Sequence, residues 1–165
     1  MNTALEHLAR IIAIGVLATA FMDAWLLVLK RLGVPTLDFA MVGRWIGHWR
    51  QGMFVHGSIA KTAPVRHEAA LGWMFHYATG VAFAALLVGV TGFGWTSSPT
   101  PGPAVALGVV TVLAPWLVMQ PAMGAGIAAS RTPSPGKNRA RSLANHFVFG
   151  LGLYLAALLV AWISR

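Results

Sequence analysis

Four long apolar stretches constrain the fold of this chain more than any other feature of its sequence. They cover residues 11–29, 69–93, 104–129 and 142–162. A helix needs about 20 apolar residues to cross the hydrocarbon core of a bilayer, and each stretch is close to that length or longer. We therefore expect an all-α protein with a single membrane domain, in which four transmembrane helices form a bundle.

The charge content agrees with a membrane protein. Only 10% of the residues are charged, against about a quarter in a typical soluble domain. The net charge of +8 does not indicate a nucleic-acid partner, because most of the basic residues lie in two loops between apolar stretches. Cysteine is absent, which excludes disulfides and thiolate metal ligands. The partner that composition predicts is the lipid bilayer.

The lysine and arginine residues predict an orientation. Residues 30–68 contain six of them and residues 130–141 contain four, whereas the connection between the second and third stretches has none and each terminus has one. Basic loops stay in the cytoplasm. We therefore expect the loops 30–68 and 130–141 in the cytoplasm and both termini outside it.

A cleavable signal peptide is the alternative interpretation of the first stretch. The sequence Ala18-Thr19-Ala20 fits a cleavage site of small residues. However, the apolar run continues to Leu29 and its basic residues follow it, whereas a signal peptide has them in front. The sequence therefore favours a transmembrane helix.

The first basic loop contains an amphipathic pattern after Asp38, which suits a helix N-cap. Its apolar face would consist of Val42, Trp45, Ile46, Trp49 and Met53. Its polar face would consist of Arg44, His48 and Gln51. Such a helix either lies in the membrane interface or packs on the protein itself, and the pattern fits both. We expect the interfacial placement, within the first cytoplasmic loop.

Each apolar stretch also carries a polar side chain at a similar distance from its cytoplasmic end. These residues are Asp23, His76, Gln120, and the adjacent Asn145 and His146. We expect them to converge on the cytoplasmic side of the bundle, with Glu68 at the mouth of the site. Gly72 and Gly80 would let the helices approach closely.

This polar layer has three interpretations. Asp23, His76 and His146 are competent ligands for a transition metal ion, with His56 as a candidate additional ligand. The same groups could relay protons, or they could only hold helices together through hydrogen bonds. The leading hypothesis is a membrane protein that binds or transports a metal ion, protons or a small polar ligand.

Two other classes of function stay open. A membrane enzyme acting on a lipid or quinone-like substrate would need a lateral cleft near Gly72 and Gly80, and the sequence contains no common catalytic motif. A helper subunit would pack against a larger membrane complex without chemistry of its own. A homodimer or a larger partner is compatible with either the transport or the helper interpretation.

Several segments resemble a known family. They are GWMFHY at 72–77, QPAMGAGIAAS at 120–130, HFVFGLGLY at 146–154 and RWIGHWRQGMFVH at 44–56. Together they resemble the small bacterial membrane proteins grouped as domain of unknown function 2938. The resemblance implies a bacterial inner-membrane protein with about four spans, and it brings no catalytic or binding residues with it.

Overall fold

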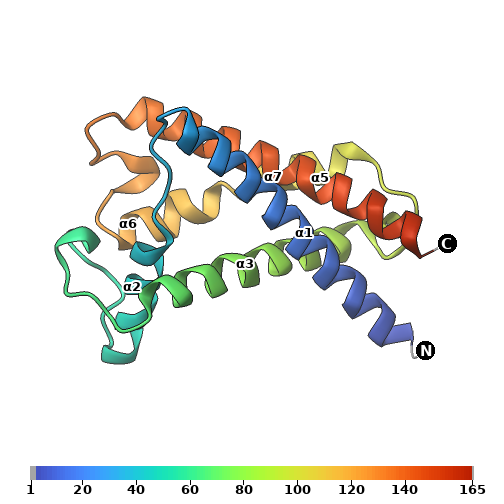
Figure 1. Ribbon diagram of the computed structural model, residues 1–165, viewed down its shortest axis with the longest axis horizontal. Coiled ribbons are helices and arrows are strands. Elements are labelled where there is room, and N and C mark those ends of the chain that lie inside the picture. The colour runs from blue at the N-terminus through green and yellow to red at the C-terminus, as the bar shows by residue number, and fades with distance from the viewer. Residues whose placement is uncertain (1–2, 165) are drawn as a thin grey trace. The chain divides into compact units, whose positions relative to one another are not determined.

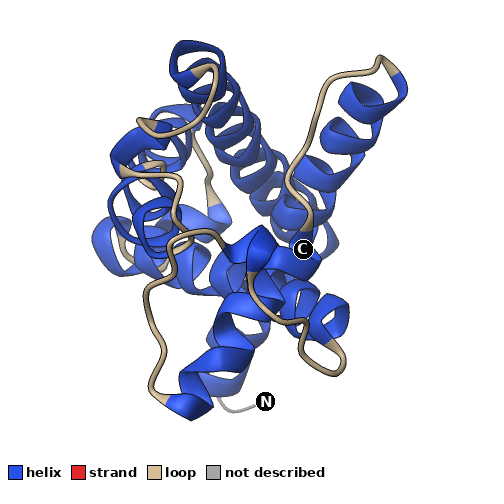
Figure 2. Ribbon diagram, turned by 90° about the vertical axis from the view of Figure 1, so that its left-hand side faces the viewer, coloured by secondary structure: helices blue, strands red, loops and turns tan. Residues whose placement is uncertain are grey.

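The computed structural model describes residues 3–164. Among these residues there are helices and loops and no strand, so the all-α prediction is confirmed (Figure 2). Four segments are long and apolar enough to cross a membrane. They are α1 (Thr3–Arg31), α3 (Glu68–Thr91), the segment Pro101–Ala122, and α7 (Pro135–Ile163) (Figure 1). The chain is therefore a multi-pass membrane protein.

Shorter elements connect these segments. The first basic loop contains α2 (Phe39–His48) and the 3-10 turns η1 (Trp49–Gln51) and η2 (Ile59–Lys61). The helix α4 (Gly94–Ser97) lies in the uncharged connection, and the turn η4 (Ile127–Ala129) comes before α7. The helices α1 and α7 are longer than the apolar stretches that predict them, because they continue into polar sequence beyond the expected membrane core.

The third membrane segment is not a uniform helix. It consists of α5 (Pro101–Val110), a π-helical turn η3 (Pro115–Met119) and α6 (Gln120–Ala122). Pro115 and Pro121 have no backbone N–H to donate, which accounts for an irregular ladder. After Ala122 the chain leaves the helix through Gly124 and Gly126, whose φ angles of 93° and 75° suit glycine. The helix therefore ends before residue 129, where the apolar stretch ends.

The chain divides into two compact units. The bundle unit combines the chain up to Pro35 with Tyr77–Thr111 and the chain from Ala144 onward. The loop unit combines Thr36–His76 with Val112–Leu143. Each unit has its own hydrophobic core.

All four membrane segments contribute to the core of the bundle unit. Its fully buried residues include Ile14 and Ala18 of α1, Ala84 of α3, Ala104 of α5 and Leu153 of α7. Small residues allow the helices to approach: a Cβ added at Gly108 would collide with the Gly150 backbone, and one at Gly15 would lie 2.5 Å from Val81 Cα. The predicted four-helix bundle is therefore present.

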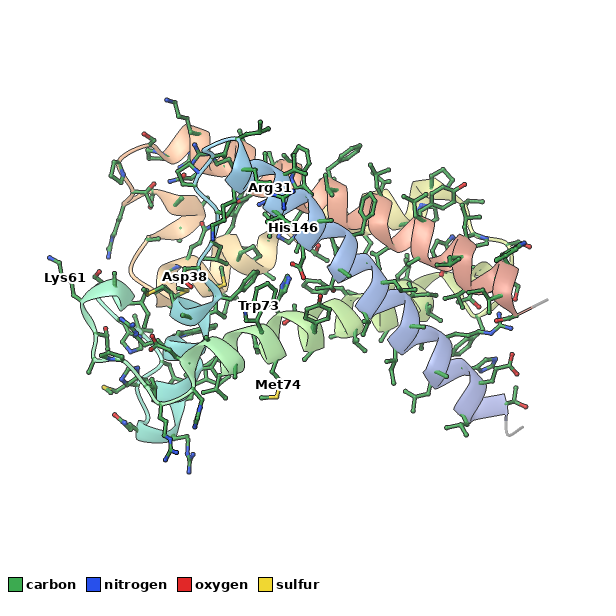
Figure 3. The ribbon with its side chains drawn as sticks, in the orientation of Figure 1. Arg31, Asp38, Lys61, Trp73, Met74 and His146 are labelled. Carbon is green, nitrogen blue, oxygen red and sulfur yellow. The ribbon has the colours of Figure 1, made fainter. Side chains whose placement is uncertain are left out.

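The outer faces of these helices are apolar and exposed. Only 22% of the most apolar window of α1 is buried within the protein, and the share in α7 is 39%. Met74, for example, points away from its neighbour Trp73 on α3 and is 66% exposed (Figure 3). Such faces suit lipid contact.

The helix α2 is present as predicted, and Asp38 caps it by accepting a 2.9 Å hydrogen bond from Ala40 N. Its apolar face helps to form the core of the loop unit, with Val42, Trp45, Ile59, Ala122 and Met123 buried. Two residues of its predicted polar face do not point into water, because Arg44 and His48 are only 8% and 5% exposed, whereas Gln51 lies beyond the end of α2 and is exposed. The side of α2 that carries Arg44 and His48 therefore packs on the protein itself, which is the second of the two placements weighed from the sequence.

Two glycines in membrane helices test the close packing of the bundle. Gly108→Leu should lower the free energy of unfolding by about 2 kcal/mol or more, because the side chain has no space against α7. Gly89→Leu is the matched control, since a Cβ at Gly89 meets nothing within 4 Å. Thermal unfolding in detergent measures both, and equal melting temperatures would contradict the packing.

Candidate functional site

Polar side chains of the bundle unit form hydrogen bonds between its membrane helices. Three pairs are present: Tyr77 Oη donates to Asp23 Oδ2 at 2.9 Å, Trp25 Nε1 donates to Asn145 Oδ1 at 3.0 Å, and Thr111 Oγ1 lies 2.9 Å from His146 Nδ1. They connect α1 to α3, α1 to α7, and the end of α5 to α7. Asp23, Asn145 and His146 were predicted as site residues, whereas Tyr77, Trp25 and Thr111 were not.

The chain has four acidic side chains. Glu6 and Glu68 lie in the first turns of α1 and α3, Asp38 lies in a loop, and Asp23 lies well inside α1. It is eight residues before Arg31, the end of α1, which is about 12 Å at 1.5 Å per residue. Its side chain is half-buried. A carboxylate at this depth is costly, and the Tyr77 hydroxyl provides one of its hydrogen bonds.

The hydrogen bonds of Thr111 fix the tautomer of His146. The Thr111 hydroxyl has one proton and donates it to Gly108 O at 2.6 Å. The same hydroxyl oxygen must therefore accept from His146, so Nδ1 carries the hydrogen of the neutral imidazole. This leaves the Nε2 lone pair of His146 to accept a proton or a ligand.

The other predicted site residues belong to the loop unit. The ring of His76 packs on Phe39 at 4.2 Å and on Trp73 at 5.8 Å between ring centroids. Gln120 Oε1 is buried and has no hydrogen-bond partner among residues 3–164. Within these residues, no three His, Asp or Glu side chains are grouped as metal ligands. A metal centre of Asp23, His76 and His146 therefore stays a prediction.

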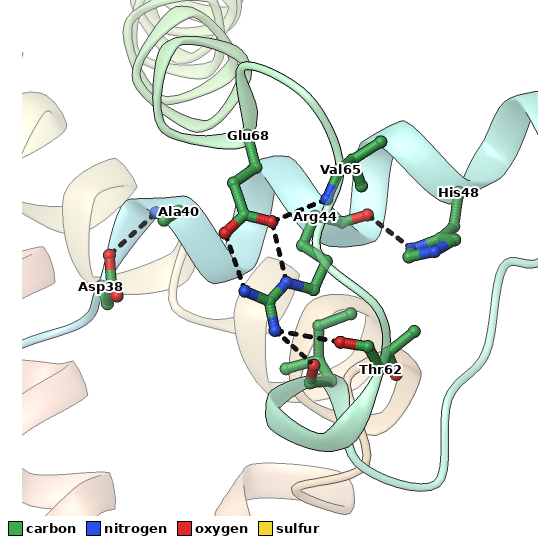
Figure 4. A network of polar contacts seen from close by, with 8 residues as sticks. Asp38, Ala40, Arg44, His48, Thr62, Val65 and Glu68 are labelled. Carbon is green, nitrogen blue, oxygen red and sulfur yellow. Dashed lines mark hydrogen bonds and ion pairs between the residues drawn. The ribbon is translucent and has the colours of Figure 1, made fainter.

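Glu68 is not an open ligand at the mouth of a site, because it forms an ion pair with Arg44 (Figure 4). Both of its oxygens accept from the guanidinium, at 2.7 and 2.8 Å, and Oε2 also accepts from Val65 N at 3.0 Å. Arg44 Nη1 donates to the carbonyl oxygens of Ile59 and Thr62. The hydrogen bonds that Arg44 donates to Glu68 raise the pKa of Arg44, so the guanidinium stays charged.

This ion pair holds three segments together, namely α2, the turn after η2 and the start of α3. The glycines beside it explain the close fit. A Cβ at Gly43 would collide with Glu68 O, and a Cβ at Gly72 would collide with Phe39 O. Gly43 on α2 and Gly72 on α3 are the sequence features from which the close contact between these two helices could have been predicted.

The glycines also bear on the enzyme hypothesis. A lateral cleft was expected near Gly72 and Gly80. Instead, Gly72 is covered by α2, and Gly80 is covered by Thr19 of α1. Close packing at both glycines therefore argues against substrate entry there.

Two histidines of the loop unit, His48 and His56, form a contact that the sequence did not predict. The sequence placed His48 on the polar face of the predicted helix and gave His56 as a candidate additional metal ligand. Their side chains are only 5% and 8% exposed, respectively, and their ring centroids are 5.2 Å apart. His48 Nδ1 lies 2.9 Å from Arg44 O. His67, in the turn before α3, is exposed.

A polar hollow of about 250 Å³ lies in the bundle unit, at the N-terminal end of α1. It contains the Glu6–Arg10 ion pair at 2.9 Å and His7, whose ring stacks on Phe93 at 3.7 Å. The hollow is lined by Glu6, His7, Arg10, Phe93, Gly94, Thr96 and Ser97.

The Arg44–Glu68 pair should contribute measurably to stability. Its side chains are 10% and 18% exposed, so losing one partner should cost about 2 kcal/mol, between the values for surface and fully buried pairs. Arg44→Met and Glu68→Leu should each lower the unfolding free energy, and the double variant should lose less than the sum.

The control for this measurement is the Arg10–Glu6 pair, in which Glu6 is 41% exposed. Arg10→Met should cost about 1 kcal/mol or less. Chemical unfolding in detergent micelles compares the variants. Equal losses for Arg10→Met and Arg44→Met would show that the loop unit does not depend on the buried pair.

Comparisons with known proteins give one finding. The model of a family described as protein of unknown function (DUF2938) matches residues 12–160. No curated protein and no solved structure matches. Because the family model covers most of the chain, and because four membrane-spanning helices agree with the earlier resemblance, this chain belongs to the DUF2938 family.

Proposed function

We propose that this membrane protein binds protons at Asp23 as part of binding or transporting a small polar ligand or ion. The observation that carries the proposal is the hydrogen bond of 2.9 Å between the Asp23 carboxylate and the Tyr77 hydroxyl, deep within the membrane helices. Ionisable residues at such positions line proton and ion pathways in many membrane proteins.

The pair has the chemistry that proton binding needs. A carboxylate accepts the tyrosine hydrogen bond when it is charged, and a protonated carboxyl group becomes a donor itself. Tyr77 can therefore hold Asp23 in place in both states. The neutral tautomer of His146 supplies a second group in the same unit whose Nε2 can accept a proton.

Proton binding is favoured here over a metal centre. The predicted metal centre would need Asp23, His76 and His146 together, and no group of three His, Asp or Glu side chains within residues 3–164 could hold a metal ion. Asp23 and His146 each have a hydroxyl group as a hydrogen-bond partner instead.

A helper subunit is the second candidate. It is favoured by the three hydrogen-bonded pairs between helices, which would also serve as structural contacts, and by the exposed apolar faces of the helices. In that case the partner is a larger complex or a second copy of the chain, and Asp23 would tolerate replacement by asparagine.

We also propose that the loop unit lies in the cytoplasm of a bacterial cell, with the connection between α3 and α5 on the outer side of the inner membrane. Eight of the twelve lysine and arginine residues belong to the loop unit, and Lys30 and Arg31 end α1. The connection Gly92–Pro103 carries no charge. This asymmetry supports the orientation.

Proton binding at Asp23 can be measured directly. The chain contains only two aspartates, Asp23 and Asp38, so side-chain ¹³C labelling of aspartate gives two carboxyl signals. The Asp23 signal should shift with pH, and Asp23→Asn should remove it, whereas Asp38→Asn should leave it in place. An Asp23 signal that never changes with pH would contradict proton binding.

The transport part of the proposal needs a flux measurement. In liposomes with an internal pH indicator, Asp23→Asn should slow the decay of a pH gradient by roughly 10²-fold, the scale for losing a positioned proton-transfer group. Trp25→Phe is the matched control, because it removes an interhelix hydrogen bond without an ionisable group. If both variants behave like the unmodified protein, the helper interpretation is preferred.

The proposed orientation can be tested with single cysteines, since the chain has none. Lys61→Cys lies in the loop unit, where Lys61 projects outward (Figure 3), and Ser97→Cys lies in the exposed uncharged connection. A maleimide that does not cross membranes should label Ser97→Cys in intact cells, and Lys61→Cys only after permeabilisation. The opposite pattern would reverse the orientation.

A further inference from the structure

We propose that His48 and His56 form a binding site for a transition metal ion of the zinc type. This site lies entirely within the loop unit. It uses neither Asp23 nor His146, so it does not depend on proton binding in the membrane. Four observations support it: the spacing of the rings, the tautomer of His48, the unsatisfied nitrogens of His56, and the backbone that holds His56.

The two rings are spaced as ligands of one ion. Their centroids are 5.2 Å apart with an angle of 57° between the ring planes. Imidazole nitrogens bind zinc at about 2.0–2.1 Å, so two imidazoles on one tetrahedral ion have ring centres roughly 5 Å apart. Both side chains are more than nine-tenths buried.

His48 is held in a tautomer that leaves Nε2 free to bind a metal ion. Its Nδ1 lies 2.9 Å from Arg44 O, which can only accept, so Nδ1 carries a hydrogen and donates it. The Nε2 lone pair is then the free ligand position of the ring. A backbone carbonyl that fixes the other ring nitrogen is the usual support for a histidine ligand.

His56 has no such support from the protein. Both of its ring nitrogens are buried, and neither has a hydrogen-bond partner among residues 3–164. A neutral imidazole left in this way lacks partners for one donor and one acceptor, and buried groups without partners destabilise the folded state. A metal ion bound by one nitrogen would satisfy the acceptor that is otherwise buried without a partner.

The backbone around His56 is fixed by the chain that follows α6. His56 N donates to Ala122 O at 2.8 Å, and Ile59 N donates to Met123 O at 3.0 Å. Gly124, with a φ angle of 93°, lies so close to Gly57 that a Cβ would collide with its carbonyl oxygen. These contacts place the His56 ring on a rigid segment beside His48, as a ligand position requires.

The donor set indicates which ion would bind. Two imidazoles without thiolate suit Zn²⁺, Co²⁺, Ni²⁺ or copper. Arg44, beside His48, is already neutralised by Glu68, so its charge does not oppose a cation strongly. Within residues 3–164 no third His, Asp or Glu completes the group. The remaining positions would go to water or a small ligand, and the site should therefore be exchangeable rather than structural.

Zinc titration of the purified full-length protein, after treatment with a chelator, tests the site. Calorimetry should show one Zn²⁺ per chain, and the melting temperature should rise with Zn²⁺ because the ion binds only the folded state. His48→Asn keeps a donor toward Arg44 O but removes Nε2, and His56→Leu removes both nitrogens. Each variant should weaken binding by about 100-fold or more, at least the loss seen when a supporting residue is changed.

The exposed His67 supplies the control, since His67→Asn also removes an imidazole and asparagine tolerates its φ of 61°. It should bind Zn²⁺ like the unmodified protein. Without metal, His56→Leu should unfold at the same temperature or higher, because it removes unsatisfied buried groups.

Two results would overturn the proposal. One is unchanged Zn²⁺ binding in both His48→Asn and His56→Leu, which would place the ion elsewhere. The other is a melting temperature of the unmodified protein that does not respond to Zn²⁺, with His56→Leu unfolding at a lower temperature. A buried water between the rings would then be the partner of His56.

Discussion

The hydrocarbon core offers no hydrogen-bond partners, and this constraint shapes the whole chain. Every polar group carried into the membrane must find its partner within the protein. The bundle unit meets this demand with pairs between helices, such as Tyr77 with Asp23 and Thr111 with His146. The close contacts of its glycines bring the helix backbones near one another.

The loop unit needs tertiary contacts for its stability, because its helical segments are too short to be stable in isolation. Arg44 and Glu68 bring α2, the turn after η2 and the start of α3 to a common point. The backbone pairing of the segments around His56 and Met123 adds a second attachment. A region that looks like a long polar loop in the sequence is thus an ordered unit with buried ionisable groups.

The sequence predicted the membrane helices because hydrophobicity along the chain reports bilayer crossing directly. It did not predict their ends: α7 begins at Pro135 within basic sequence, since a helix can continue into water without any apolar signal. The depth argument singled out Asp23 and His146 but not their hydrogen-bond partners Tyr77 and Thr111, because tyrosine and threonine carry no charge that would mark them in an apolar stretch. The helical pattern of α2 was read correctly, yet the burial of its polar face depends on Glu68, which is distant in sequence.

The turn before α7 has a consequence for how this protein can vary. Ala128 and Ala129 adopt left-handed φ angles of 47° and 59°, which cost an alanine about 1 kcal/mol or more each. Arg139 holds this conformation through a 2.8 Å hydrogen bond to Ala128 O. The backbone of this turn is therefore strained. A residue inserted or deleted there would disrupt the turn and distort the first turns of α7. Such length changes, which most surface connections accept, should be rare in this one.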